Sequence, residues 1–298
     1  MKCPIRTGLL SIILLLIMSI SLGCTQSTDR SSDKRIVAVS IVPQETFVKE
    51  VAKDLVDVIT LIPPGNSPET YSPTPKELQK FSQASIYFTI GVPAEQANIL
   101  PATRDLSPNT KIVDLASIVS REYPDREFAP GERDPHIWLS PKRVKVMIDT
   151  IQKELSDLDP ENSDTYQKNA ENYKARLDEL DLSIKEKLKD LPNKSFIVYH
   201  PAFGYFADDY SLEMISLEEE GKEATPQRFQ EVVEIAKSKG IKVIFHQAEV
   251  DSRQAKAFAE EIGGRAEKIA PLAPDYIENL EKMADILADT LKDSNKRD

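Results

Sequence analysis

Short apolar runs rich in β-branched residues alternate with amphipathic stretches along most of the chain. Between the runs, apolar residues recur every three or four positions, which is the period of a helix buried on one side. Strands that alternate with helices are typical of βα units, so we predict an α/β fold with a parallel sheet in each half. The expected strands are residues 36–42, 57–62, 85–90 and 111–115, then 196–199, 213–217, 241–245 and 266–270.

The middle of the chain has a different pattern. From Tyr166 to Leu188, apolar residues fall at alternating intervals of three and four, which indicates one buried stripe on a long helix. About 30 helical residues would extend roughly 45 Å, more than one lobe needs. We therefore predict a rigid connecting helix between two lobes, and a coiled-coil-like surface helix is the alternative. The predicted parts are an N-terminal lobe at 36–158, the connecting helix at 159–191 and a C-terminal lobe at 192–298.

The first residues have the pattern of an export signal. Lys2 and Arg6 precede an apolar run too short for a confident membrane span, which predicts a signal peptide over residues 1–23. Cys24 follows at once, so we expect it to become the lipidated first residue, with residues 24–35 as a tether. Ordinary signal cleavage and an uncleaved anchor are the alternatives. The protein would then be exported, and either anchored by lipid to the outer face of the cytoplasmic membrane or periplasmic.

Cysteine usage and charge limit the classes of function. Cys3 would leave with the signal peptide, so we expect neither a disulfide nor a cysteine metal ligand. The net charge of −11 argues against a nucleic-acid partner, because phosphate binding needs basic patches. It is compatible with a cationic ligand.

Several polar residues lie where a ligand site would be expected. His200 and His246 each follow a predicted strand, at the edge where parallel sheets bind ligands. His136 lies in the proline-bracketed DPHIWLSP, Glu69 in GNSPETYSPTP and Asp275 in PLAPDY. Two imidazoles and two carboxylates suit a first-row divalent cation. The hypothesis is a metal site formed by Glu69, His136, His200 and Asp275.

Each of these residues also has an ordinary structural interpretation. Glu69 taken alone could be a solvated loop acid, and His200 and His246 could be hydrogen-bonded core histidines. Asp275 could begin the helix that follows it without binding a ligand. Spacing does not decide between these readings, because the residues are far apart in the sequence.

Longer motifs resemble a known family. They are PPGNSPETYSPTPKEL, DPHIWLSPKRV, VYHPAFGYFADDYSL with EEEGKEATP, and IAPLAPDYIENLEKMADIL. Together they resemble the metal-binding lipoproteins of ABC importers, the zinc/manganese/iron class of periplasmic solute-binding proteins. The resemblance covers nearly all of the chain after the signal peptide and implies two βα lobes joined by one long rigid helix, with the metal between them. It implies the ligands Glu69, His136, His200 and Asp275.

The chain departs from the family pattern in two places. Most relatives have histidine where Glu69 stands, so the resemblance implies a harder, more oxygen-rich site, which shifts the expected cargo somewhat from zinc towards manganese or iron. Alternatively, Glu69 points away and a water fills its position. The stretch REYPDREFAPGERD lacks the histidine-rich loop of many zinc-specific relatives. His246 does not match a usual ligand, and it either supports a ligand through a hydrogen bond or is simply buried.

These inferences predict a transport protein and not an enzyme. We expect it to capture Zn²⁺, Mn²⁺ or Fe²⁺ as cargo and deliver the ion to an ABC importer permease. A binder of an organic metal complex, such as a siderophore or corrinoid, would need more aromatic residues than Trp138 and Tyr71. A metal-dependent hydrolase would need a general base, and no motif places one. A surface adhesin would not need converging ligands.

Overall fold

The computed structural model describes residues 34–104, 106–218, 222–249 and 253–293. Residues from Arg35 onward form one compact unit. The predicted signal peptide, most of the tether and Cys24 lie outside the described residues. Within the described part of the chain, no helix is both long and apolar enough to cross a membrane.

The first sheet contains four parallel strands in the order β2-β1-β3-β4. All four coincide with predicted strands; β3 is buried along its whole length, and β1 is buried from Val37 to Val39. The strands are β1 (Arg35–Val39), β2 (Val56–Thr60), β3 (Ile86–Thr89) and β4 (Lys111–Asp114). The connecting helices are α2 (Val42–Ala52), α3 (Pro75–Phe81), the π-helix η1 (Glu95–Ile99), α4 (Leu100–Arg104) and α5 (Leu115–Val119).

The second sheet repeats this architecture with the order β10-β9-β7-β8, again entirely parallel. Its four strands also coincide with predicted ones, which confirms the prediction of one parallel sheet in each half. The strands are β7 (Ser195–Val198), β8 (Glu213–Ser216), β9 (Val243–Gln247) and β10 (Arg265–Ile269). The helices are α8 (Gly204–Asp209), α9 (Pro226–Lys239), α10 (Arg253–Glu261) and α11 (Tyr276–Asp293).

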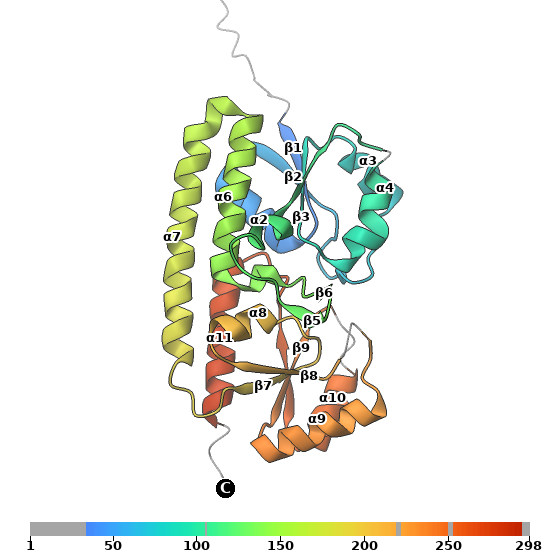
Figure 1. Ribbon diagram of the computed structural model, residues 1–298, viewed down its shortest axis with the longest axis vertical. Helices are drawn as coiled ribbons and strands as arrows, with labels where there is room; N and C mark the ends of the chain where they lie inside the picture. The colour runs from blue at the N-terminus through green and yellow to red at the C-terminus, as the bar shows by residue number, and fades with distance from the viewer. Residues whose placement is uncertain (1–33, 105, 219–221, 250–252, 294–298) are drawn as a thin grey trace, which may run out of the picture. The chain divides into compact units, whose positions relative to one another are not determined.

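A long helix joins the two halves. Helix α6 (Pro141–Leu158) ends at a short 3₁₀ turn, η3 (Pro160–Asn162), and α7 (Ser163–Leu188) then runs for 26 residues. Figure 1 shows α7 beside α6 and α11, and it packs on α2 as well, so it contacts helices of both lobes. The predicted connecting helix is therefore confirmed. Its buried stripe is the predicted one: Tyr166, Ala170, Tyr173, Leu177, Leu180, Ile184 and Leu188.

One small element was not predicted. Strands β5 (Glu127–Ala129) and β6 (Glu132–Arg133) form an antiparallel hairpin whose turn contains Gly131 at φ 84°. Two- and three-residue strands are too short to show a hydrophobic alternation, so the sequence pattern could not reveal them. The hairpin leads directly into the segment that carries His136.

The loop between β10 and α11 is fastened to the N-terminal lobe. The indole Nε1 of Trp138 donates a hydrogen bond to the carbonyl of Pro271 at 3.0 Å. The hydroxyl of Tyr276 donates to the carbonyl of Trp138 at 2.7 Å, and Thr46 Oγ1 donates to the carbonyl of Pro274 at 2.5 Å. One hydrophobic core accordingly continues from the first sheet through α7 to α11.

Candidate metal site

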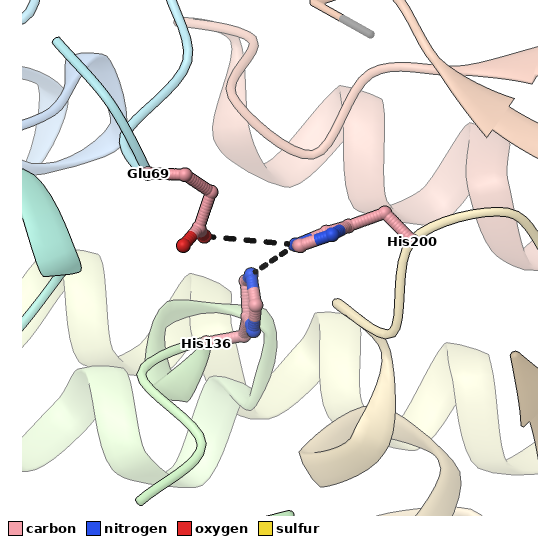
Figure 2. A group of neighbouring side chains, drawn as sticks. All are labelled: Glu69, His136 and His200. Atoms are coloured by element: carbon pink, nitrogen blue, oxygen red, sulfur yellow. Dashed lines mark hydrogen bonds and ion pairs between the residues drawn. The ribbon is translucent and has the colours of Figure 1, made fainter. Parts of the chain in front are cut away.

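Three side chains from distant parts of the sequence meet between the two sheets. Glu69 comes from the loop after β2, His136 from the segment before the 3₁₀ turn η2 (Ile137–Leu139), and His200 from the loop after β7. Figure 2 shows all three pointing toward one another. His200 Nε2 lies 3.2 Å from His136 Nε2 and 3.7 Å from Glu69 Oε1. One potential ligand atom from each residue therefore lies within 4.8 Å of the other two.

The loop that carries Glu69 is fixed at both ends. The carbonyl of Pro68 accepts a hydrogen bond from Ala94 N at 2.9 Å, and the carbonyl of Tyr71 accepts one from Asn98 at 2.9 Å. The hydroxyl of Tyr71 donates to both carboxylate oxygens of Glu77 at 2.9 and 3.0 Å. These contacts position Glu69, whose side chain remains 27% exposed.

Glu77 links this loop to helix α3. Its carboxylate also accepts from the backbone N–H of Thr74 at 2.7 Å, completing the capping box at the start of α3. Burial acts to raise the pKa of Glu77, but the hydrogen bonds from Thr74 and Tyr71 outweigh it and lower the pKa. Burial and the Glu77 carboxylate together raise the pKa of Tyr71 to about 12. The pair therefore stays intact across the neutral pH range.

His136 is oriented by a fully buried carboxylate. Asp134 Oδ1 lies 2.8 Å from His136 Nδ1 and also accepts the backbone N–H of His136 at 2.9 Å. Arg126 Nε lies 3.5 Å from the other oxygen of Asp134 and balances its charge. Gly204 packs against this pair, and a Cβ at that position would lie 2.6 Å from Asp134 Oδ2. The ion pair thus requires glycine at position 204.

His200 has an equivalent partner in the other lobe. Glu218 Oε2 lies 2.7 Å from His200 Nδ1, and both side chains are almost completely buried. The backbone N–H of Glu218 bonds the carbonyl of Tyr199, which fixes the carboxylate relative to the end of β7. Each imidazole is therefore held by a carboxylate on the nitrogen that faces away from its neighbour.

These carboxylates determine which nitrogen of each ring carries the proton. An ionised carboxylate can only accept a hydrogen bond, so Nδ1 of His136 and of His200 carries the hydrogen. In the neutral rings, both Nε2 lone pairs then face each other across 3.2 Å. Two imidazole nitrogens on one tetrahedral zinc would be about 3.3 Å apart, given Zn–N bonds of about 2.05 Å. The spacing and the protonation pattern both suit a cation held between the rings.

The three residues line a cavity of about 220 Å³. Its wall also includes Trp138, Glu218, Gln247 and Glu249, together with residues of the loops around Pro68 and Pro271. The Trp138 ring lies 5.1 Å from the His136 ring and covers one side of it. Carboxylates and imidazoles are thus concentrated in a small cavity between the lobes.

Comparison with known proteins now identifies the family. The family described as "Zinc-uptake complex component A periplasmic" matches residues 37–290. The chain belongs to this family. The family description names a component of an uptake complex and does not name an enzyme.

Individual relatives differ in the metal that their names state. The chain is 28% identical over 287 residues to the "High-affinity zinc uptake system protein ZnuA" of Bacillus subtilis (strain 168), covering 89% of this chain and 90% of the relative. It is 27% identical over 271 residues to the "Manganese ABC transporter substrate-binding lipoprotein PsaA" of Streptococcus anginosus, covering 86% of each. A solved structure, "Crystal structure of ZnuA", is similar with a TM-score of 0.82 and 36% identity, covering 87% of this chain and 99% of that one.

Two residues named from the sequence lie apart from the three that meet. Asp275 is exposed and immediately precedes α11, where its carbonyl accepts the N–H of Asn279 at 2.8 Å. The structure thus does not bring Asp275 into the group with Glu69, which agrees with the alternative that it begins a helix. His246 lies within β9 and its Nδ1 is 3.2 Å from the carbonyl of Gln247. Successive residues of a strand face opposite sides, and here Gln247 and not His246 lines the cavity.

Four polar residues around the site were not predicted. Asp134, Glu218, Gln247 and Glu249 were not singled out as site residues. Asp134 could have been found, since it lies two residues before His136 in the same rigid motif. Glu218 and Glu249 had no such signal, because only the pairing of β7 with β8 and β9 brings them near His200.

Proposed function

We propose that this family member captures a divalent transition metal ion between its two lobes, with Glu69, His136 and His200 as ligands. One observation carries the proposal: two histidines with carboxylate-bound Nδ1 atoms present their Nε2 lone pairs to each other at 3.2 Å. When both rings are neutral, these two lone pairs face each other unfavourably, and a cation between them makes both nitrogens ligands. Carboxylate–imidazole–metal arrangements of this kind fix the ring orientation and strengthen the ligand.

The ion is cargo, and its destination is a membrane transporter. The zinc relative is named as a protein of an uptake system and the manganese relative as a substrate-binding lipoprotein of an ABC transporter, which supports delivery to an ABC importer permease. The manganese relative is named a lipoprotein, which supports attachment of this chain to the outer face of the cytoplasmic membrane through a lipid on Cys24. An organic metal complex is disfavoured, because sites for such ligands are lined mainly by apolar and aromatic side chains, and Trp138 is the single Phe, Tyr or Trp among the described residues that line this cavity.

A competition titration tests the proposal. Metal-free protein is titrated with Zn²⁺, Mn²⁺ and Fe²⁺ against chelators of known affinity, alongside His136→Ala and His200→Ala. Wild-type protein should bind one ion tightly, and each alanine variant should lose tight binding while unfolding as cooperatively as wild type. Normal binding by both variants would show that the ion is held elsewhere.

A Glu69→His variant tests the choice of metal in the same titration. Zinc should bind more tightly than manganese in either protein, following the usual affinity order, so the informative quantity is the ratio of the two affinities. Replacing the oxygen ligand by nitrogen should widen that ratio in favour of zinc. An unchanged ratio would mean that Glu69 is not a ligand.

A further inference from the structure

The three ligands leave the coordination of an ion incomplete. A zinc site with three protein ligands keeps an open position, which suits catalysis, whereas a site that stores its ion is usually closed by four. Asp275, the fourth ligand expected from the sequence, is exposed and lies outside the group. A further donor would therefore have to come from the cavity wall.

Glu249 has the properties of that donor. It follows β9 by two residues and lines the same cavity as Glu69, His136 and His200. Its Oε2 is completely buried and has no hydrogen-bond partner among the described residues. A buried carboxylate oxygen without a partner is unfavourable, so an ion in the cavity would remove a cost that the empty protein carries.

The other carboxylates beside the two histidines are already hydrogen-bonded to the imidazoles. Glu218 accepts from His200 Nδ1 at 2.7 Å, and moving it to the ion would release the ring that it orients. Asp134 is bound in the same way to His136, with Arg126 on its other oxygen. Among the carboxylates that line the cavity, Glu69 and Glu249 alone are not hydrogen-bonded to an imidazole.

Gln247 provides an independent indication at the same place. Its side chain is 7% exposed and lines the cavity, and its Nε2 has no hydrogen-bond partner within the described part of the chain. Gln247 and Glu249 are two positions apart at the end of β9, where alternate residues face the same side. An amide donor beside a carboxylate can bind the oxygen that does not contact the ion.

We infer that Glu249 is the fourth protein ligand and contacts the ion by rotation of its side chain, with Gln247 supporting its free oxygen. The inference rests on the proposed function. With Glu249 the ion would have two carboxylates and two neutral imidazoles as ligands, a set that suits a first-row divalent cation. The C-terminal lobe would then hold the ion through β7 and β9 together.

The test compares two conservative variants, Glu249→Gln and Asp275→Asn. Zinc affinity is measured by chelator competition, and Co²⁺ serves as an optical probe because its visible spectrum depends on the number and geometry of ligands. Glu249→Gln should weaken zinc binding at least about tenfold and change the Co²⁺ spectrum. Asp275→Asn should leave both at wild-type values. With chelator present, Glu249→Gln should be at least as stable as wild type, because it removes the charge of a carboxylate whose Oε2 is buried without a hydrogen-bond partner among the described residues.

The outcomes separate this inference from the proposed function. If Glu249→Gln keeps wild-type affinity and spectrum while His200→Ala loses binding, the metal site stands and Glu249 is not a ligand. If Asp275→Asn is the variant that weakens binding, the expectation from the sequence is restored. If neither His136→Ala nor His200→Ala weakens metal binding, the proposed site is wrong, and Glu249 cannot be its fourth ligand.

Discussion

Replacing Glu218 by glutamine tests how much the carboxylate behind His200 contributes to metal binding. The amide oxygen of glutamine can still accept from His200 Nδ1, so the ring keeps its tautomer and loses only the charge of its partner. Hydrogen bonds to charged groups contribute about 1.5–3 kcal/mol and neutral ones about 0.5–1.5 kcal/mol. The contact is short, at 2.7 Å, and the Glu218 side chain is only 9% exposed, so little of this difference is screened by solvent. We expect a loss of about 1–1.5 kcal/mol, or about 5- to 12-fold in zinc affinity.

Glu218→Ala extends the same test, because it removes the acceptor itself. Its expected loss is larger, up to about 100-fold, since the ring is then free to rotate or change tautomer. Both variants are measured by chelator competition, and their denaturant midpoints in chelator show whether the fold is intact. Equal affinities of wild type, Glu218→Gln and Glu218→Ala would refute the argument that this carboxylate prepares His200 for the ion.

Three further predictions concern stability. Burial raises the pKa of Glu95 to about 7 from 4.5, so the folded protein holds a proton that the unfolded chain releases. The free energy of unfolding should therefore fall by about 3 kcal/mol as the pH rises from 4.5 to 7. Glu95→Gln should make the free energy of unfolding less dependent on pH, as measured by denaturant titrations with chelator present. Gly204→Ala should displace Asp134 and Arg126, lowering stability by about 1–3 kcal/mol and weakening metal affinity in the same preparations. Leu177→Ala, at a fully buried position of α7, should cost about 2–5 kcal/mol in thermal or denaturant unfolding, whereas Leu182→Ala on its exposed face should cost under about 0.5 kcal/mol.

The fold was predictable from the sequence because its elements are regular and locally marked. Eight short apolar runs became eight strands, and the stripe from Tyr166 to Leu188 became the buried side of α7. Thr74, Ser140 and Thr225 each begin a helix with proline next, as their side-chain hydrogen bonds show. The hairpin of β5 and β6 was missed, since its strands carry too few residues for any period.

The site was predictable only in part, because its geometry depends on which loops the sheets bring together. Glu69, His136 and His200 lie in stiff segments or after a strand, and all three meet as predicted. Asp275 lies in an equally promising motif, yet its loop is held to the other lobe through Pro271, Pro274 and Tyr276, and its side chain is exposed. A stiff motif indicates that the backbone of a residue is fixed. It does not indicate whether the side chain faces the cavity or the solvent.

The fastening of the β10–α11 loop to Trp138 and Thr46 has a kinetic consequence. Since this loop ties the C-terminal lobe to the N-terminal lobe through three hydrogen bonds, little backbone rearrangement is available when an ion enters or leaves. In a preorganised site, little free energy is lost to ordering when the ion binds. The resulting gain in affinity appears chiefly as a smaller dissociation rate constant. We therefore expect spontaneous release of the ion to be slow. We also expect a receiving transporter to accelerate release by separating these loops.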